Sequence, residues 1–350
     1  MTNILYGVHG IGHGHAIRAL TIASSFPQHN FLFISDGDGY NMLQSEHKVF
    51  RLSVNGSPAF HHSMPYSGAV SSYCKNILAG KQGRKEALQA VELFKPDVAI
   101  TDYESNVPWL CRKTGLPCLS LDHQHIARFG SLSLPLTRTV DLALLRIAIW
   151  MQFHELRNHM IISFFDPPLR SKRRVKVFPP ILRQKVLDRV STEGEHVLAY
   201  HGYSTTSDFH RFLLSLPHPV RCYGMNEDRV VANVTYRKKS TDHFLDDLAS
   251  CRYVLSTAGH TLLSEALYYG KPVMAFPIRN ACEQYINGYY LEKNGYGIMN
   301  DAFRPSSDIL DGFEKNLENY KKNIQKTCFC GNEKVTAVLK HYFDTKEYIV

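Results

Sequence analysis

The stretch ILYGVHGIGHGHAIRAL, residues 4–20, is the strongest single indication of the fold. Its apolar start, Ile4–Val8, is typical of a buried strand, and the residues from Ala16 onward have helical spacing. The three glycines between them permit a tight turn and close approach of the backbone to a ligand, while the helix start offers free N–H groups. A strand, a glycine-rich turn and a helix together predict the first unit of a doubly wound α/β domain.

This alternation continues through the first half of the chain and starts again in the second. In the first half, strand-like runs follow at Asn30–Ser35, Val49–Val54, Asp97–Thr101, Cys118–Leu121 and Met160–Phe164. In the second half they lie at His196–Tyr200, Val220–Tyr223, Val231–Tyr236, Tyr253–Ser256 and Val273–Phe276. Helical patterns separate these strands, which predicts two Rossmann-like, doubly wound parallel sheets.

A proline-rich break divides the two halves. Pro167-Pro168 and Pro179-Pro180 bracket a basic segment, and proline pairs disfavour both helix and strand ladders. We therefore expect an N-terminal domain over residues 1–165, a linker over 166–184 and a C-terminal domain over 185–330. Residues 331–350 are expected to form a terminal helix, for which packing back on the N-terminal domain is one option. Ligands bind at the carboxyl ends of parallel strands, so two such domains are expected to face a cleft.

The composition is that of an ordinary globular chain with excess positive charge. Forty Lys and Arg residues exceed 32 Asp and Glu residues, which gives a formal net charge of +8. This charge favours an anionic partner, such as a phosphate-bearing ligand or an anionic membrane face. Nucleic acid is not expected, because no nucleic-acid-binding motif accompanies the charge. The start lacks signal-peptide features, so we expect a cytoplasmic protein, with peripheral contact at the inner face of the membrane as an option.

His15 stands where the glycine-rich turn passes into the helix. The spacing of Gly10, Gly12 and Gly14 departs from the dinucleotide fingerprint, and only Asp36 and Asp38 are candidates to hold a ribose, which weakens NAD binding without excluding it. A histidine at such a turn suits a general base. The alternative is a histidine that only caps the turn.

Two acids, Asp102 and Glu104, follow the strand predicted at Asp97–Thr101. In a parallel sheet this strand end lies at the same edge as His15, where a carboxylate could bind the far imidazole nitrogen and fix its tautomer. The alternative is a structural role, since either acid could cap the next helix.

A second strand, small-residue turn and helix occurs at residues 256–266, STAGHTLLSEA. Free N–H groups at that helix start would bind a diphosphate. Glu265 lies about one helical turn inside, where a carboxylate can hold two neighbouring hydroxyls. Glu283 and Gln284 precede another predicted helix and form an acid–amide pair that can bind hydroxyl groups.

These motifs resemble those of the GT-B glycosyltransferases, closest to the MurG-like and UDP-glucuronosyltransferase-like branch. The resemblance rests on the G-x-G-x-G-H-A-x-R run ending at Arg18 and on Gly259, Glu265, Gly270-Lys271-Pro272-Val273, Pro277 and Glu283-Gln284, in the family's order. It implies that His15 acts as the base, with Asp102 or Glu104 behind it, and that Gly10, Gly12, Gly14 and Arg18 form the acceptor-side loop. It also implies that Glu265 holds the ribose, that Gly259, His260 and Thr261 line the diphosphate, and that Glu283 and Gln284 contact the donor sugar.

The resemblance further implies an inverting, metal-independent hexosyl- or N-acetylhexosaminyltransferase without a cofactor. Its partners would be a nucleotide-sugar donor, with UDP-sugar as the first expectation, and a hydroxyl acceptor such as a lipid or cell-surface glycan precursor. The Gly14–Arg18 run is shared with GT-B nucleotide-sugar hydrolases, so hydrolysis, and more distantly epimerisation, are alternatives. A nucleotide-sugar sensor without turnover is a third hypothesis, because fold does not fix function.

Other features have weaker functional interpretations. Asp36-Gly37-Asp38-Gly39 favours a polar turn over a metal motif, His61-His62 favours a substrate loop over a metal site, and the lone Cys328-x-Cys330 pair does not predict zinc. No metal site is therefore expected. Residues Leu142–Phe153, with Arg138, Arg146 and Arg157 nearby, favour an ordinary buried helix over contact with an anionic membrane or lipid acceptor.

Overall fold

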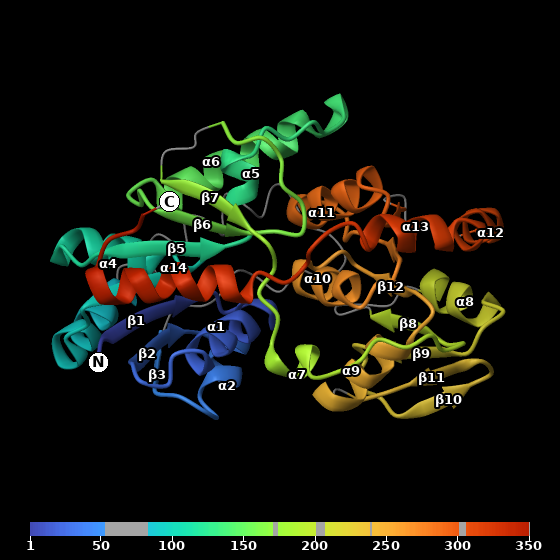
Figure 1. Cartoon of the computed structure of the whole chain (residues 1–350), viewed down its shortest axis with the longest axis horizontal. Helices are drawn as coiled ribbons and strands as arrows, with labels where there is room; N and C mark the ends of the chain where they lie inside the picture. Colours follow the sequence, from blue (N-terminus) through green and yellow to red (C-terminus); the bar gives the residue numbers. More distant parts are fainter. Residues whose placement is uncertain (53–82, 171–173, 201–206, 239, 301–305, 350) are drawn as a thin grey trace. The chain divides into compact units, whose positions relative to one another are not determined.

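The computed structural model describes residues 1–52, 83–170, 174–200, 207–238, 240–300 and 306–349 (Figure 1). Two compact units divide the chain: the described residues up to Arg183 together with the segment from Gly331 onward, and the described residues of Gln184–Cys330. Each is an α/β unit around a seven-stranded sheet of described residues. The predicted fold class is therefore confirmed. The expected substrate loop at His61-His62 lies outside the described residues.

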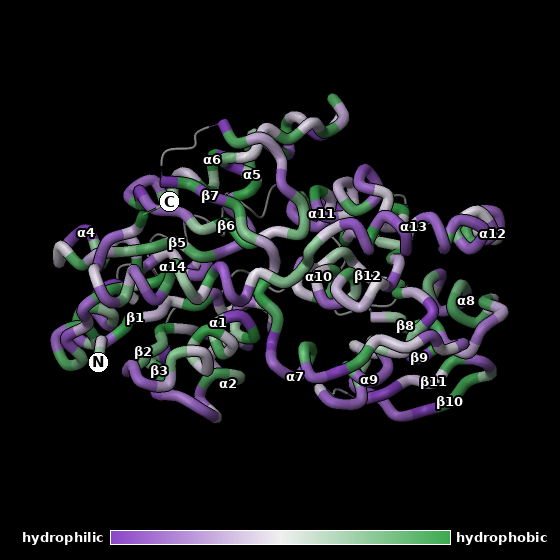
Figure 2. The backbone as a smooth tube through the Cα atoms, in the orientation of Figure 1, coloured by the Kyte–Doolittle hydropathy of each residue, from purple (hydrophilic) through white to green (hydrophobic). Residues whose placement is uncertain are grey.

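The first sheet has the order β3-β2-β1-β4-β5-β6-β7, and every neighbouring pair of strands is parallel. Its strands are β1 (Asn3–Val8), β2 (Asn30–Ser35), β3 (Val49–Arg51), β4 (Val98–Asp102), β5 (Cys118–Asp122), β6 (His159–Ile162) and β7 (Val175–Phe178). The accompanying helices are α1 (Gly14–Ser24), α2 (Gly37–Leu43), residues 83–94, α4 (Asn106–Thr114), α5 (His125–Phe129), η1 (Leu136–Arg138), α6 (Thr139–Phe153) and α14 (Asn332–Thr345). Side chains of β1, β2, β4, β5 and β6 are buried in one hydrophobic cluster, and the tube of Figure 2 is green along much of β5.

The segment expected to be a linker, residues 166–184, instead contributes an edge strand. β7 pairs in parallel with β6, with Met160 opposite Lys176 and Ile162 opposite Phe178. Val175 and Phe178 are buried, whereas Lys176 is exposed, as an edge position allows. The short apolar run between the two proline pairs therefore adds to the sheet of the first unit.

The terminal helix α14 belongs to the core of the first unit, although it is the last helix of the chain (Figure 1). Val335, Leu339, Tyr342 and Phe343 pack in the same hydrophobic cluster as β1, β4 and β5. The Tyr342 hydroxyl also donates a 3.1 Å hydrogen bond to the carbonyl of Ala99 in β4. Burial of these side chains fixes the end of the chain against the sheet.

The second sheet has the order β10-β11-β9-β8-β12-β13-β14 and is parallel except for the β10–β11 pair. Its strands are β8 (Val197–Tyr200), β9 (Val220–Tyr223), β10 (Arg229–Val231), β11 (Val234–Tyr236), β12 (Val254–Ser256), β13 (Val273–Ala275) and β14 (Gly297–Met299). The helices are α7 (Gln184–Leu187), α8 (Ser207–Ser215), α9 (Thr241–Ser250), α10 (His260–Tyr268), α11 (Cys282–Lys293), α12 (Ser307–Lys315) and α13 (Leu317–Ile324).

One predicted strand of this unit, Val231–Tyr236, is wrong as a single element. The chain turns back within it, because Ala232 adopts a left-handed backbone conformation with φ 51°, and β10 and β11 pair as an antiparallel hairpin. Among the described residues of both units, no helix has the length and apolar character needed to cross a membrane.

Candidate active site

The candidate site of the first unit lies at the carboxyl ends of β1, β4 and β5. β1 and β4 are neighbours in parallel register, with Val8 opposite Asp102. The loop after β1 leads into α1, where His15 is the second residue, so the histidine and Asp102 meet at one sheet edge. This is the edge at which doubly wound sheets bind ligands.

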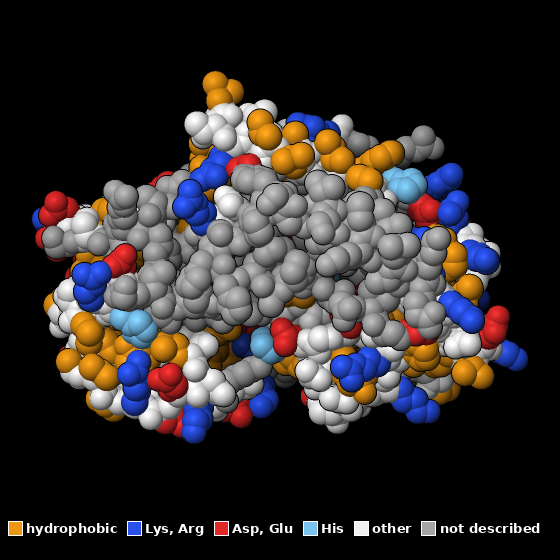
Figure 3. Space-filling view, turned by 180° about the vertical axis from the view of Figure 1, so that it is seen from behind, with side chains coloured by type: hydrophobic (Ala, Val, Ile, Leu, Met, Phe, Trp, Pro, Cys, Tyr) orange, Lys and Arg blue, Asp and Glu red, His pale blue; other side chains and the backbone are white. Residues whose placement is uncertain are grey.

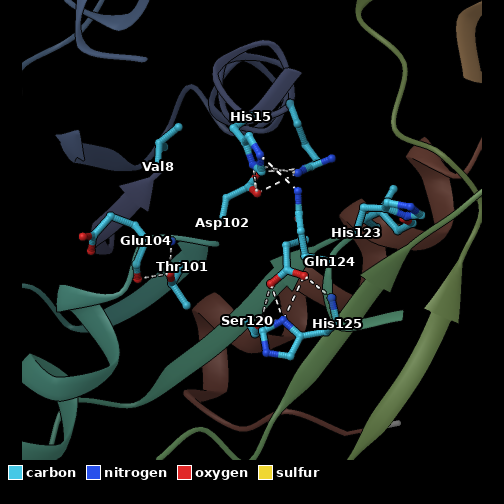
Figure 4. Close-up of polar contacts among 12 residues, drawn as sticks. Val8, His15, Thr101, Asp102, Glu104, Ser120, His123, Gln124 and His125 are labelled. Carbon is cyan, nitrogen blue, oxygen red and sulfur yellow. Dashed lines mark hydrogen bonds and ion pairs between the residues drawn. The ribbon is translucent and has the colours of Figure 1, made fainter. Parts of the chain in front are cut away.

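His15 is held by a buried carboxylate that also binds an arginine (Figure 4). His15 Nδ1 lies 2.6 Å from Asp102 Oδ1, and Asp102 is completely buried. The Arg18 guanidinium donates to both carboxylate oxygens, from Nε at 2.7 Å and from Nη2 at 2.6 Å. Although burial disfavours the charged guanidinium, the carboxylate of Asp102 raises the pKa of Arg18 above its usual value. The guanidinium is therefore charged, and it binds the same carboxylate that faces the imidazole.

Gln124 contacts the opposite side of the same imidazole. It follows β5 and precedes α5, and its Nε2 lies 3.2 Å from His15 Nε2 (Figure 4). With Nδ1–H directed at the carboxylate, Nε2 carries the lone pair and accepts from the amide. That lone pair is the one a general base would use. No sequence motif singled out Gln124; its position after a parallel strand is the signal that could have found it.

His9 and Tyr103 enclose His15 from the side. The His9 ring lies 5.2 Å from the His15 ring and 5.5 Å from that of Tyr103, in edge contacts. Close packing of protein around His9 and, to a smaller extent, the positive charge of His15 when protonated lower the pKa of His9 to about 3. His9 is therefore neutral at ordinary pH, which leaves His15 as the histidine here with a carboxylate partner.

Glu104 does not stand behind His15, so that alternative for the acid is wrong. Its carboxylate accepts from the backbone N–H groups of Asn106 and Val107 and from the Asn106 amide, at 2.8–3.0 Å. These are the first residues of α4, so Glu104 satisfies the start of that helix. The chain turns at Tyr103, whose φ of 57° directs the two acids to different partners.

The glycine-rich loop is supported by the loop after β2. A Cβ on Gly10 would meet Asp36 Oδ1 at 1.6 Å, and Gly12 has a left-handed φ of 75°. The backbone N–H of Gly12 donates to Asp38 Oδ2 at 3.1 Å. Asp36 and Asp38 thus lie at the start of α2, where they brace this loop, and Gly14 opens α1.

A buried network supports α5 below His15. The Ser120 hydroxyl donates to Asp122 Oδ2 at 2.7 Å, and His125 Nδ1 lies 2.7 Å from the same oxygen (Figure 4). Burial alone would raise the pKa of Asp122, but His125 and these hydrogen bonds lower it. The pKa of neighbouring His159 falls to about 3, through burial and the charge of His125. Sequence reasoning missed this network, which fixes the segment that carries Gln124.

The candidate donor residues lie in the second unit, after the neighbouring strands β12 and β13. Ala258 has a left-handed φ of 63°, and its N–H donates to Ser256 Oγ at 3.1 Å. Gly259 precedes α10, whose first two residues are His260 and Thr261, and a Cβ at Gly259 would meet nothing within 4 Å. The backbone is therefore open to close approach at the start of α10.

The remaining donor candidates belong to α10 and α11. Glu265 is only 2% exposed, so its carboxylate lies inside the unit. Glu283 is in the first turn of α11, and Gln284 accepts a 2.9 Å hydrogen bond from the N–H of Ile278. Asn287 Nδ2 donates to the Ala258 carbonyl at 3.1 Å, which joins α11 to the turn before α10. The candidates after β12 and β13 are thus connected.

Clusters of metal ligands are absent from the part of the chain that the structure describes: no three His, Cys, Asp or Glu side chains there are grouped to hold a metal ion. Cys328 is exposed, and its thiol contacts the Cys330 carbonyl at 3.4 Å.

Comparison with known proteins agrees with this architecture. A family model described as Glycosyl transferase family 1 matches residues 2–318. An uncharacterized glycosyltransferase of Methanosarcina acetivorans is 22% identical over 365 residues, covering 92% of each chain. The solved UGT2 of Phytolacca americana, complexed with UDP-2-fluoro-glucose and pterostilbene, has a TM-score of 0.68 at 12% identity, covering 99% of this chain and 100% of its own. VinC, solved in complex with dTDP, has a TM-score of 0.66 at 12% identity, covering 98% and 99%.

These structures share the GT-B fold that the sequence motifs resembled, and the family model spans most of the chain, so the protein belongs to glycosyltransferase family 1.

Proposed function

We propose that this glycosyltransferase is inverting and metal-independent, with His15 as the general base. The observation that carries the proposal is the placement of His15, whose Nδ1 lies 2.6 Å from the buried carboxylate of Asp102 and whose Nε2 lies 3.2 Å from the Gln124 amide. His15 Nε2 removes the proton from an acceptor hydroxyl as its oxygen attacks C1 of the donor sugar. The new C1–O bond forms on the face opposite the leaving group, and the C1–O bond to the diphosphate breaks.

The proposed donor is a nucleotide sugar, with UDP-sugar as the first candidate. The relatives solved with a UDP-sugar analogue and with dTDP support this class of ligand. In this chain, the N–H groups at the start of α10 would stabilise the charge that develops on the departing diphosphate. Glu265 would bind the ribose, and Glu283 and Gln284 the sugar. Such backbone donors serve without a bound cation, which supports the metal-independent proposal.

The proposed acceptor is a hydroxyl on a lipid-linked or cell-surface glycan precursor. The side chain of His15 is 12% exposed, so the imidazole is accessible from solvent. The cytoplasm is the proposed place of reaction.

Calorimetric titration with UDP-glucose, UDP-N-acetylglucosamine and dTDP-glucose, with and without EDTA, tests the donor proposal. A true donor at 100 times its dissociation constant should also add about 2.7 kcal/mol to the free energy of unfolding. We expect binding to survive EDTA and diphosphate release to be slow until an acceptor extract is added. EDTA-sensitive binding restored by magnesium would contradict the metal-independent proposal. Full-speed release of free sugar without an acceptor would instead indicate a hydrolase.

A further inference from the structure

Helix α6 is apolar on two opposite faces, although it lies at the surface. Its inner residues Leu142, Ile149 and Phe153 are buried. Its outer face and the preceding η1 turn carry side chains that are 41–91% exposed: Leu136, Val140, Leu144, Ile147, Trp150 and Met151. A helix that is apolar all round is normally buried, so the sequence expectation of an ordinary buried helix holds for one face only.

These exposed residues form one continuous stripe. They are separated mostly by three or four positions, which places them on the same side of the helix. The stripe extends over about 20 Å, at about 1.5 Å per residue. Figure 3 shows hydrophobic side chains gathered in a row over α6, along the upper edge of that face. Single exposed hydrophobics are ordinary, whereas a continuous patch marks an interaction surface.

The charges around the stripe favour an anionic partner. Two of the nearby acids are already paired: Asp141 lies 3.2 Å from Arg138, and Glu155 lies 2.7 Å from Arg112. Between residues 128 and 170 the sequence has three acids, Asp141, Glu155 and Asp166, and five arginines, Arg128, Arg138, Arg146, Arg157 and Arg170. The whole chain carries a formal charge of +8. Anionic lipid attracts such a surface, whereas a second copy of the same charge is repelled.

The inner face of α6 is connected to the candidate base. Phe153 stacks on Tyr103 with ring centroids 5.0 Å apart, and the Tyr103 ring lies 6.4 Å from that of His15. Arg146 fixes α6 to the α5 region by donating to the carbonyls of Ala127, at 2.8 Å, and Gly130, at 3.1 Å. The helix that carries the exposed stripe therefore packs, on its other face, against the residues around His15.

We propose that the outer face of α6 docks this protein on an anionic lipid bilayer. The helix lies in the plane of the headgroups with its apolar stripe directed to the acyl chains, and the excess of arginines in this region attracts the lipid phosphates. Docking rests on the exposed stripe of α6 and on the charges around it, without the proposed function. Delivery of a lipid-borne hydroxyl to His15 rests in addition on the proposed function.

The test is co-sedimentation of the full chain with vesicles of equimolar phosphatidylcholine and phosphatidylglycerol, without donor or acceptor. We expect binding that weakens with salt and is much weaker to phosphatidylcholine alone. The triple variant Leu144→Gln, Ile147→Gln, Met151→Gln should lose about tenfold or more in affinity, because each apolar side chain contributes free energy on leaving water. The matched control is Leu93→Gln, Val190→Gln, Val230→Gln, which removes exposed hydrophobics elsewhere and should bind like wild type.

A second readout locates the contact. The chain has two tryptophans, so in a Trp109→Phe variant the fluorescence reports Trp150 alone, and its emission should shift to the blue on vesicle binding. Equal vesicle binding by the triple variant, or no vesicle binding by wild type, would overturn the proposal. The proposal would also be overturned if light scattering showed that the wild type is a dimer and the triple variant a monomer. Donor titration without vesicles is run in parallel, so a failure of docking is distinguishable from a failure of the proposed function.

Discussion

Replacing Asp102 with asparagine tests the assignment of the candidate base most directly. The carboxylate is completely buried, and it is bound by His15 and by Nε and Nη2 of Arg18. Asp102→Asn keeps the shape of the side chain but leaves the Arg18 charge buried without its counter-ion. Breaking a buried ion pair in this way costs about 3–5 kcal/mol. At about 2–4 °C per kcal/mol for a unit of this size, the melting temperature of the first unit should fall by roughly 6–20 °C.

The same substitution should reduce kcat by roughly 10² to 10⁴, the range for loss of general-base function. The asparagine no longer holds Nδ1–H of His15 with a negative charge, so Nε2 loses both its fixed orientation and the stabilisation of its protonated form. Stability and catalysis can be separated with the double variant Arg18→Met, Asp102→Asn. Removing both charges should recover most of the lost stability, because no unpaired charge is then left buried. It should not recover turnover.

The matched control is Glu104→Gln, a buried acid two residues further along the chain. Since Glu104 serves the start of α4, its substitution should cost about 1 kcal/mol of stability and leave kcat unchanged. The measurements are thermal unfolding by circular dichroism and single-turnover release of nucleoside diphosphate. Wild-type turnover in Asp102→Asn, recovered turnover in the double variant, or an equal loss of turnover in Glu104→Gln would refute the assignment.

Three further outcomes follow from the site. His15→Ala should lower kcat by roughly 10² to 10⁴ while donor affinity measured by calorimetry is unchanged; normal turnover would remove the base assignment. Gln124→Ala should lower the acceptor KM about two- to tenfold, because the acceptor hydroxyl no longer has to displace the Gln124 amide from His15 Nε2, a hydrogen bond worth about 0.5–1.5 kcal/mol. An unchanged KM would contradict that competition. Because the pKa of His159 is lowered to about 3, the unfolded chain takes up a proton that the folded chain does not, so stability is lost as pH falls from about 6.5 towards 3. His159→Gln should reduce that slope by up to about 1.4 kcal/mol per pH unit in denaturant titrations, and an unchanged slope would count against a neutral buried His159.

The placement of His15 beside Asp102 could be predicted because it depends only on strand order. Any doubly wound parallel sheet puts the loops after neighbouring strands at one edge, and β1 and β4 are neighbours. The choice between Asp102 and Glu104 could not be made in the same way. Two residues apart in a continuing strand, both acids would point to one face. In the structure β4 ends at Asp102, and the left-handed backbone of Tyr103 turns Glu104 towards α4. The residue types at these positions do not predict that turn.

Elements whose character depends on tertiary contacts were less predictable. β7 lies between two proline pairs and is short, so its local signal is that of a connection, and only pairing with β6 makes it a strand. The hydrophobicity of α6 was visible in the sequence, but which of its faces the rest of the first unit would cover was not. Gln124 belongs to no motif. It contacts His15 because it lies between β5 and α5, at the carboxyl end of the sheet.

Arg18 shows how a residue can be identified by a motif and still be given the wrong place. The resemblance put it in the acceptor-side loop, whereas in the structure its guanidinium binds Asp102 from inside α1. Helix geometry predicts this contact. His15 and Arg18 are three residues apart, so they share one face of α1 and can reach the same carboxylate. We therefore expect Arg18 to hold Asp102 in position, as the proposed action of His15 as a base through Nε2 requires.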